Sequence, residues 1–253
     1  MAKAPKTAYV CNDCGAEFSR WQGQCSACKA WNTISEVRLI SALNSAKNDR
    51  FSGYAGEIRA KIQTLSEISL QETPRFTSGF KELDRVLGGG IVPGSAILIG
   101  GHPGAGKSTL LLQVMCGLAK NMTALYVTGE ESLQQVAMRA NRLNLPTDKL
   151  NMLSETSVEQ ICNLADQLKP QIIVVDSIQV MHLSDIQSSP GSVAQVRECA
   201  SFLTRYAKTR QVAIIMVGHV TKDGTLAGPK VLEHAIDCSL LLEGEADSRF
   251  RTL

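Results

Sequence analysis

From about Pro74 to the end of the chain, short apolar runs alternate with segments in which apolar residues recur at helical spacing. The apolar runs predict strands at Ala96–Gly100, Ala124–Thr128, Ile172–Asp176, Val212–Gly218 and Cys238–Glu243. The periodic segments predict helices at Lys107–Lys120, Ser132–Leu143, Ser157–Leu168 and Ser192–Arg210. Because runs that are apolar on both faces suit the buried centre of a parallel sheet, this alternation predicts an α/β domain with a mostly parallel sheet covered by helices.

Two regions that precede this domain differ from it in composition. Residues 1–36 are rich in Cys, Gly and Trp and show little periodic pattern. Residues 37–73 are mixed and polar, with one weak strand-like run at Ile62–Ile68, which is typical of a linker. The sequence therefore predicts a small N-terminal module (residues 1–36), a linker (residues 37–73) and an α/β domain (residues 74–253).

Charge and hydropathy narrow the classes of function. The net charge is only +2, so the chain does not coat nucleic acid by bulk charge, and any such contact must come from local patches. No stretch approaches the roughly 18–20 uninterrupted apolar residues of a membrane helix. The first residues, Met1–Lys6, are followed by no apolar signal core. We therefore expect no membrane partner and a cytoplasmic location.

One segment matches the phosphate-loop pattern G-x-x-x-x-G-K-[ST] without a mismatch, between a predicted strand and a predicted helix. Its residues are Gly101, His102, Pro103, Gly104, Ala105, Gly106, Lys107 and Ser108. In such a loop the backbone N–H groups face the phosphates, and we expect Lys107 to reach the β- and γ-phosphates and Ser108 to ligate Mg²⁺. Thr109 supplies the next hydroxyl. The segment therefore predicts ATP binding with Mg²⁺; the alternative is a glycine turn with a solvated lysine.

Three carboxylates follow predicted strands on the side of the phosphate loop. Asp176 ends an apolar run and is expected to hold Mg²⁺ through water opposite Ser108, unless it merely ends a buried strand. Glu130 and Glu131 directly follow the strand that ends at Thr128. We expect Glu130 to be the base that activates the attacking water, with Glu131 as the second candidate. Alternatively, both are first-turn acids that favour the start of the next helix.

The eight cysteines fall into two groups. Two C-x-x-C knuckles, separated by ten residues, predict a closed tetrahedral Zn²⁺ site of structural type, whose ligands are Cys11, Cys14, Cys25 and Cys28. Two disulfides are the alternative, which a reducing compartment disfavours. Since about 30 residues bury little core, the metal should hold this module folded. The other four cysteines are expected to be buried small hydrophobic residues.

Two tryptophans flank the second knuckle, with cationic residues beside them. Trp21 follows Arg20, and Trp31 lies two residues after Lys29. Trp21 is a candidate for stacking on unpaired nucleic-acid bases. The alternative is that both indoles pack around the metal as a small core, and this is what we expect for Trp31.

These motifs occur in the order and spacing of a known family. The phosphate loop, Glu130–Glu131, the Val-Asp-Ser strand end and the segment Gly218–Gly224, together with the cysteine pairs, closely resemble the RadA (Sms) family of bacterial DNA-repair proteins over essentially the whole chain. The segment Ala227–His234 is similar to the one that follows the second DNA-facing loop of that family. The resemblance implies a RecA-like P-loop ATPase that forms homo-oligomeric, hexameric rings, binds single-stranded DNA and promotes branch migration of recombination intermediates. It also implies a recombinase of the RecA type as partner.

The resemblance adds further candidate residues. His219 stands where RecA-like motors place a polar group that senses the γ-phosphate; the alternative is a strand-end histidine bonded to backbone. Lys222 and Lys230 lie in the following loop region and are candidates for contact with the DNA phosphates, although loop lysines are often only solvated charges. Residues 182–191 occupy the position of a DNA-facing loop, but an ordinary surface loop explains them nearly as well.

The chain departs from the family pattern at its end. Family members have a Lys-Asn-Arg-Phe-Gly signature shortly after the equivalent of Leu253, followed by a domain that resembles Lon protease. We therefore expect an ATPase domain truncated at its C-terminus, in which ring assembly, translocation and ATPase activity are open. The rival interpretation is a nucleotide-regulated DNA- or protein-binding factor without motor activity, and Glu130–Glu131 argue against it because a switch needs no water-activating base. A small-molecule kinase lacks support, since no arginine-rich lid segment is visible.

Overall fold

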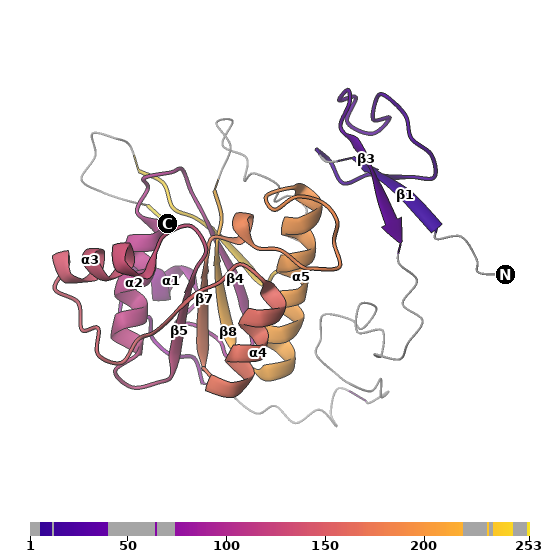
Figure 1. Cartoon of the computed structure of the whole chain (residues 1–253). Coiled ribbons are helices and arrows are strands. Elements are labelled where there is room, and N and C mark those ends of the chain that lie inside the picture. The colour runs from indigo at the N-terminus through magenta and orange to yellow at the C-terminus, as the bar shows by residue number, and fades with distance from the viewer. Residues whose placement is uncertain are drawn as a thin grey trace.

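The computed structural model describes residues 6–11, 13–39, 64, 74–219, 232, 235–244 and 252–253. They form a three-stranded sheet near the N-terminus and a six-stranded sheet with helices (Figure 1). Lys222, Lys230 and nearly all of the two segments Ile62–Ile68 and Ala227–His234 lie outside the described residues.

The small sheet contains the cysteine knuckles. Strand β1 (Lys6–Cys11) pairs antiparallel with β2 (Glu17–Phe18) and with β3 (Ile34–Leu39). Strand β3 therefore runs three residues past the expected module boundary at residue 36. The interior of this sheet is small: its buried residues are Cys11, Cys25 and Ile34. So little buried apolar surface is typical of a module that depends on a metal for its stability.

The large sheet has the parallel arrangement that the sequence predicts. Its strands are β4 (Ala96–Gly100), β5 (Ala124–Thr128), β6 (Asn151–Ser154), β7 (Ile172–Asp176), β8 (Ala213–Val217) and β9 (Cys238–Leu241). They lie in the order β6-β5-β7-β8-β4-β9, and each neighbouring pair is parallel. Only β6 was not predicted. Strand β8 lies between β4 and β7, and therefore separates the phosphate-loop strand from the strand that ends in Asp176.

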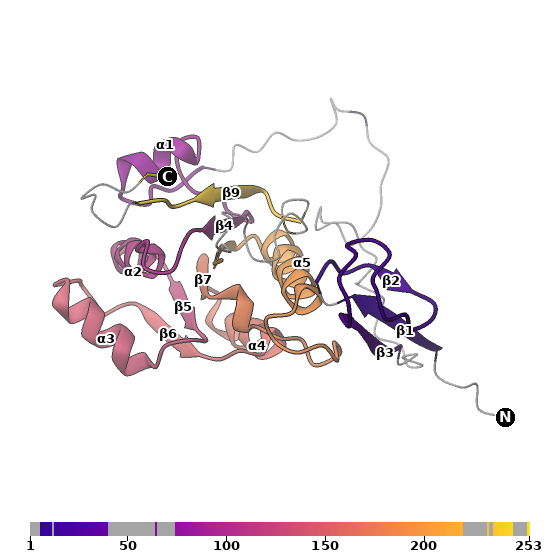
Figure 2. The same ribbon diagram turned by 90° about the horizontal axis from the view of Figure 1, so that it is seen from above.

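Helices cover both faces of the large sheet. They are α1 (Lys81–Val86), α2 (Lys107–Leu118), α3 (Leu133–Arg142), α4 (Val158–Leu168) and α5 (Val193–Arg210). Helices α1, α2 and α3 pack on one face, and α4 and α5 on the other (Figure 2). The hydroxyls of Ser132, Ser157 and Ser192 each accept a hydrogen bond from the backbone N–H three residues later, which fixes where α3, α4 and α5 begin.

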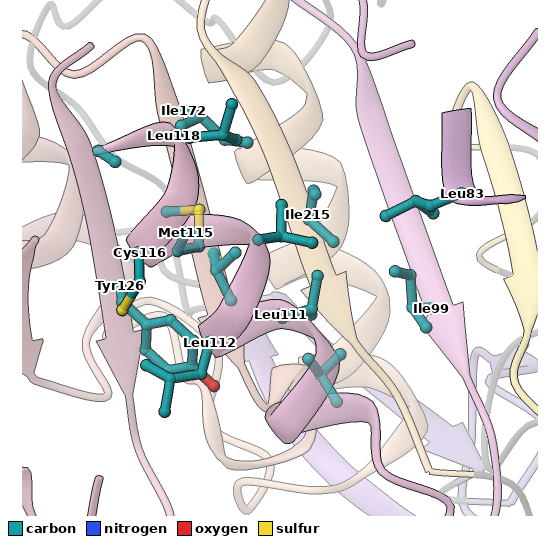
Figure 3. Close-up of a cluster of buried hydrophobic side chains, with 14 of the residues drawn as sticks. Leu83, Ile99, Leu111, Leu112, Met115, Cys116, Leu118, Tyr126, Ile172 and Ile215 are labelled. Atoms are coloured by element: carbon teal, nitrogen blue, oxygen red, sulfur yellow. The ribbon is translucent and has the colours of Figure 1, made fainter. Parts of the chain in front are cut away.

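Side chains alternate between the two faces along each central strand. Tyr126 and Ile215 face α2 and contact the cluster that contains Leu111, Leu112 and Met115 (Figure 3). Their neighbours along the strands face α4 and α5. Every residue of β4, β5, β7 and β8 is buried, as expected for the centre of a parallel sheet. The strand predicted at Cys238–Glu243 is present as β9, but it does not lie in the buried centre: β9 is an edge strand, and Ser239 and Leu241 are exposed.

Three of the four scattered cysteines, Cys116, Cys162 and Cys199, are buried as predicted, and Cys238 is half-buried. Within the described part of the chain, none of the helices combines the length and the apolar character needed to cross a bilayer.

Candidate active site and metal centre

The phosphate loop joins the end of β4 to the first turn of α2. Gly104 and Gly106 have φ values of 82° and 99°, a left-handed conformation that costs little only for glycine. The side chain of Lys107 is buried, and its Nζ donates hydrogen bonds to the carbonyls of Gly101 (2.7 Å) and His102 (3.0 Å). The loop thus curls around the ammonium group. Burial lowers the pKa of Lys107, while the negative charges of Asp176 and Glu130 act to raise it.

Close packing at the start of the phosphate loop explains why residue 101 is a glycine. A Cβ atom at this position would lie 2.4 Å from the carbonyl oxygen of Leu242, just beyond the end of β9. The backbone of the edge strand therefore approaches the loop more closely than any side chain allows.

Asp176 lies at the end of β7 and is buried, with 8% of its surface exposed. Tyr126 donates a hydrogen bond from its hydroxyl to Asp176 Oδ2, at 2.5 Å. Burial raises the pKa of Asp176, and hydrogen bonds with Tyr126 and Ser108 act in the opposite direction. The structure thus brings Ser108 and Asp176, the two expected magnesium ligands, into contact. A hydroxyl and a carboxylate oxygen are ligands that suit Mg²⁺.

Glu130 faces the phosphate loop from the end of β5. Its Oε1 atom accepts a hydrogen bond from Ser177 Oγ and lies 3.2 Å from His219 Nε2. The hydrogen bond with His219 lowers the pKa of Glu130 most; burial opposes this shift, and Ser177 and the charge of Lys107 support it. The carboxylate is therefore ionised at neutral pH and held in place by two side chains.

Glu131 has a different environment, although it is the next residue. Its carboxylate forms an ion pair with Arg139 of α3. Its backbone N–H donates to the hydroxyl of Thr128 (3.2 Å), and that hydroxyl donates to the carbonyl of Glu131 (2.8 Å). These contacts anchor the end of β5 to α3.

His219 follows β8 by two residues. Because β8 lies between β4 and β7, the imidazole stands between the strand that carries the phosphate loop and the strand that carries Asp176. The polar groups at the ends of four adjacent strands therefore meet at one edge of the sheet. Sequence reasoning did not identify Tyr126, Ser177 or Arg139 as residues of this site.

The loop at residues 182–191 is held from beneath by α5. Gln195 is buried, and its Nε2 donates to the carbonyls of Ile186 and Ser188, both at 2.9 Å. Its Oε1 accepts from the N–H of Leu183 at 3.1 Å. These hydrogen bonds connect the backbone of the loop to α5, and the role of the loop in DNA binding stays a prediction.

The four knuckle cysteines converge on one point. All four Sγ atoms lie within 4.8 Å of one another, with Cys11 to Cys28 at 3.7 Å and Cys14 to Cys25 at 3.5 Å. A tetrahedral zinc ion with Zn–S bonds of about 2.3 Å requires sulfur atoms about 3.8 Å apart. The separations therefore fit a four-thiolate metal site, whereas a disulfide requires about 2 Å. All four are free cysteines.

Both knuckles use the same backbone pattern. The N–H of Gly15 donates to the carbonyl of Cys11 (2.9 Å), and the N–H of Lys29 donates to that of Cys25 (2.8 Å). Gly15 and Lys29 both have positive φ values, 73° and 64°. Lys29 therefore takes the position in the second knuckle that Gly15 takes in the first.

The expectation that Trp31 packs around the metal is wrong. Trp31 is 68% exposed and Trp21 is 58% exposed. The space around the metal ligands is instead taken by Ile34, with Tyr9 and Phe18 packed against it.

Comparisons with known protein families support both the α/β domain and the four-cysteine module. Residues 62–225 match the profile of the family described as AAA domain, and residues 9–36 match the one described as Rubredoxin metal binding domain. The chain belongs to the AAA domain family. The predicted α/β P-loop core and the predicted four-cysteine metal module are thereby confirmed.

Individual relatives are similar over the whole chain. The identity is 94% over 253 residues to the DNA repair protein RadA of Haemophilus influenzae, 74% over 254 residues to that of Escherichia coli, and 56% over 253 residues to that of Pseudomonas aeruginosa. Each alignment covers 100% of this chain but 55% of the relative, so the chain spans about half the length of the curated relatives that it matches. The resemblance to the RadA family is confirmed.

Proposed function

We propose that this chain is the ATPase part of a DNA-repair motor that hydrolyses ATP in response to single-stranded DNA and promotes branch migration of recombination intermediates. The observation that carries the proposal is the environment of Glu130. An ionised carboxylate that faces the phosphate loop and is held by both Ser177 and His219 suits a general base. A protein that only switches between nucleotide states needs no such group.

In this mechanism Lys107 binds the β- and γ-phosphate oxygens, which replace the two loop carbonyls as its partners. Glu130 accepts a proton from the attacking water, whose oxygen forms a bond to the γ-phosphorus as the bond to the β-phosphate oxygen breaks. The products are ADP and inorganic phosphate. The imidazole of His219 contacts Glu130 Oε1, the oxygen that also accepts the hydrogen bond from Ser177. We expect His219 to sense the γ-phosphate.

Ser108 and Asp176 would hold Mg²⁺, Ser108 directly and Asp176 through water. The ion supplies charge neutralisation at the phosphates. Tyr126 keeps the buried carboxylate of Asp176 oriented for this task.

We further propose that the four-cysteine site holds Zn²⁺ in a structural role. Tetrahedral thiolate sets suit zinc, and four protein ligands leave no open position for catalysis. Metal analysis of the purified protein tests the assignment: one zinc per chain is expected, and iron in its place would refute it.

The similarity to proteins named for DNA repair supports the remaining parts of the proposal. These are a cytoplasmic location, assembly into a hexameric ring, a recombinase of the RecA type as partner, and contact of Lys222 and Lys230 with the DNA phosphates.

The test is ATP hydrolysis with and without single-stranded DNA, for the wild-type chain and three variants. Lys107→Ala should abolish nucleotide binding and turnover. Glu130→Gln should keep ATP binding but lower turnover by about a hundredfold or more, because it removes the base. Glu131→Gln is the matched control, since the neighbouring carboxylate pairs with Arg139, and its turnover should stay close to that of the wild type.

Equal losses for Glu130→Gln and Glu131→Gln would contradict the assignment of the base. If the chain binds ATP and DNA does not change its turnover, the motor proposal fails, and a nucleotide-regulated DNA- or protein-binding factor becomes the better description.

A further inference from the structure

Two large aromatic side chains project from the metal module into solvent. Trp31 is 68% exposed, the highest value among the large hydrophobic residues that the structure describes. Trp21 and Met138 follow, each 58% exposed. Large apolar side chains are usually buried, and those that are exposed together often mark the surface that contacts a partner.

The two indoles lie next to each other. A Cβ atom placed on Gly23 would be 3.8 Å from Trp21 Cη2 and 3.9 Å from Trp31 Cζ3. The six-membered rings therefore flank the same point of the backbone, where the residue is a glycine. The φ of Gly23 is not positive, so the turn itself does not require glycine. A larger residue would occupy the space between the rings.

The backbone holds this arrangement without help from the indoles. Gln24 and Trp31 form an antiparallel bridge, and the N–H of Asn32 donates to the carbonyl of Gly23 at 2.8 Å. The side chain of Gln24 donates to the carbonyl of Lys29 at 2.8 Å. The knuckle is thus closed by its own hydrogen bonds and the metal ligands, and more than half of the surface of each indole remains exposed.

Positive charge accompanies the rings. Arg20 and Lys29 are exposed, one directly before Trp21 and the other two residues before Trp31. Flat π-faces stack on nucleobases regardless of sequence, and neighbouring cations attract the phosphate backbone. Bases paired within a duplex are already stacked and offer no free face.

We propose that Trp21 and Trp31 form a base-stacking site for single-stranded nucleic acid on the metal module. The site deepens the proposed DNA-dependent function and rests on it. Unpaired bases stack on the two indoles, while Arg20 and Lys29 contact the flanking phosphates.

The chain offers a direct probe, because Trp21 and Trp31 are its only two tryptophans. A thymidine oligonucleotide that stacks on them should quench the tryptophan fluorescence of the wild-type chain. An abasic oligonucleotide of the same length carries the same phosphates without bases and should bind more weakly and quench little. A duplex of the same length should also quench little.

Variants separate the two rings. Trp21→Ala and Trp31→Ala should each weaken binding of a labelled thymidine oligonucleotide on the order of tenfold, measured by anisotropy. Trp21→Phe and Trp31→Phe should retain most of the affinity because they keep a stacking face. Met138→Ala is the matched control, since Met138 on α3 is also 58% exposed and should leave affinity unchanged. Bound zinc is measured for every variant to verify that the module is folded.

The outcomes are distinguishable. If the wild type binds the oligonucleotide and alanine variants with full zinc bind equally well, the stacking site is refuted while the proposed function stands. Equal binding of the abasic oligonucleotide also refutes it, because the contact is then to phosphates alone. If the wild type binds no single strand under any condition, the proposed DNA dependence itself fails. A double alanine variant that keeps oligonucleotide binding but loses binding to a recombinase would assign the pair to protein docking and overturn the proposal.

Discussion

Tyr126 shows how one hydroxyl in a buried strand acts on the site. The phenol lies among apolar side chains on the α2 face (Figure 3). Its hydroxyl, the only polar group of the side chain, donates a hydrogen bond to Asp176 Oδ2. Burial and the negative charge of Asp176 both raise the pKa of Tyr126, so the hydroxyl keeps its proton and always acts as the donor. Tyr126 is therefore a positioning residue for the carboxylate expected near Mg²⁺.

Tyr126→Phe should keep the apolar contacts and remove this donor. Partners that orient metal-binding groups typically change metal affinity or activity by about 10–100-fold, so the Mg²⁺ concentration that gives half-maximal ATPase activity should rise about tenfold. Titration of turnover with Mg²⁺ measures this shift. Tyr206→Phe is the control, because Tyr206 donates to Asp166 between α5 and α4 at 2.9 Å, away from the phosphate loop. An unchanged Mg²⁺ requirement in Tyr126→Phe would refute the role.

The sequence alone could not distinguish the roles of the adjacent residues Glu130 and Glu131. The sequence placed Glu130 and Glu131 at the correct edge of the sheet, because strand ends in a parallel sheet share one edge. It could not assign their partners, since Ser177, His219 and Arg139 come from three other elements. The direction of each side chain depends on the path of the chain after Thr128, which the pattern of apolar residues does not encode.

At the scale of elements, Gly129 allows the end of β5 to approach the segment that follows Asp176. A Cβ atom at Gly129 would lie 2.6 Å from Val180 Cγ2 and 2.8 Å from Met181 Cε, atoms at the end of the 3₁₀ helix η3 (Ile178–Val180) and just beyond it. The N–H of Gly129 also donates to the carbonyl of Asp176 at 2.9 Å. This approach places Glu130 beside Ser177.

Gly129→Ala should therefore force the two segments apart. Overpacking of this kind costs roughly 1–3 kcal/mol, so the free energy of unfolding should fall by about this amount, together with ATPase activity. Gly117→Ala is the control with the opposite expected effect. Gly117 is an exposed residue of α2, and no other atom lies within 4 Å of the position that a Cβ atom would take, so alanine should raise the free energy of unfolding by about 0.5–1 kcal/mol. Urea denaturation measures both. A neutral effect of Gly129→Ala would show that η3 is free to move.

Element boundaries were predictable where a local hydrogen bond fixes them. Three predicted helix starts fell on the serine that caps the helix, because the sequence signal and the cap are the same residue. Strand β6 was missed since Asn151–Ser154 is short and only half-buried at the sheet edge, so it lacks a strong apolar run. Helix α1 was missed because six residues carry less than two turns of periodic pattern.

At the scale of the whole molecule, the described residues form three separate apolar cores, and no buried residue belongs to more than one of them. One belongs to the metal module and contains Cys11, Cys25 and Ile34; the other two lie on the faces of the large sheet. The sequence led us to expect a metal module separate from the α/β domain, because cysteine spacing and apolar periodicity occur in different segments. It could not predict that the tryptophans are excluded from the smaller core.

Separate cores predict separate responses to loss of the metal. Burial raises the pKa of Cys14 to about 12. Burial also acts to raise the pKa of Cys11, but hydrogen bonds with Thr33 and with the N–H groups of Cys14 and Asp13 lower it to about 6. Because a cysteine binds metal as the thiolate, a bound cation has to stabilise the deprotonated form of Cys14 against its raised pKa, and metal binding is thereby coupled to the folding of the module.

Cys28→Ser or a strong chelator should therefore unfold the metal module and expose its thiols to alkylation. The α/β domain should keep its urea midpoint, because its two cores contain none of the module's residues. Thiol labelling and circular dichroism report the two units separately. Cys162→Ser is the opposite control: Cys162 of α4 is buried in the α/β domain, where a hydroxyl would replace an apolar sulfur, so the midpoint should fall while the metal of the module remains bound. A common shift of both units after chelation would mean that the metal stabilises the ATPase domain as well, and the two would then have to be treated as one cooperative structure.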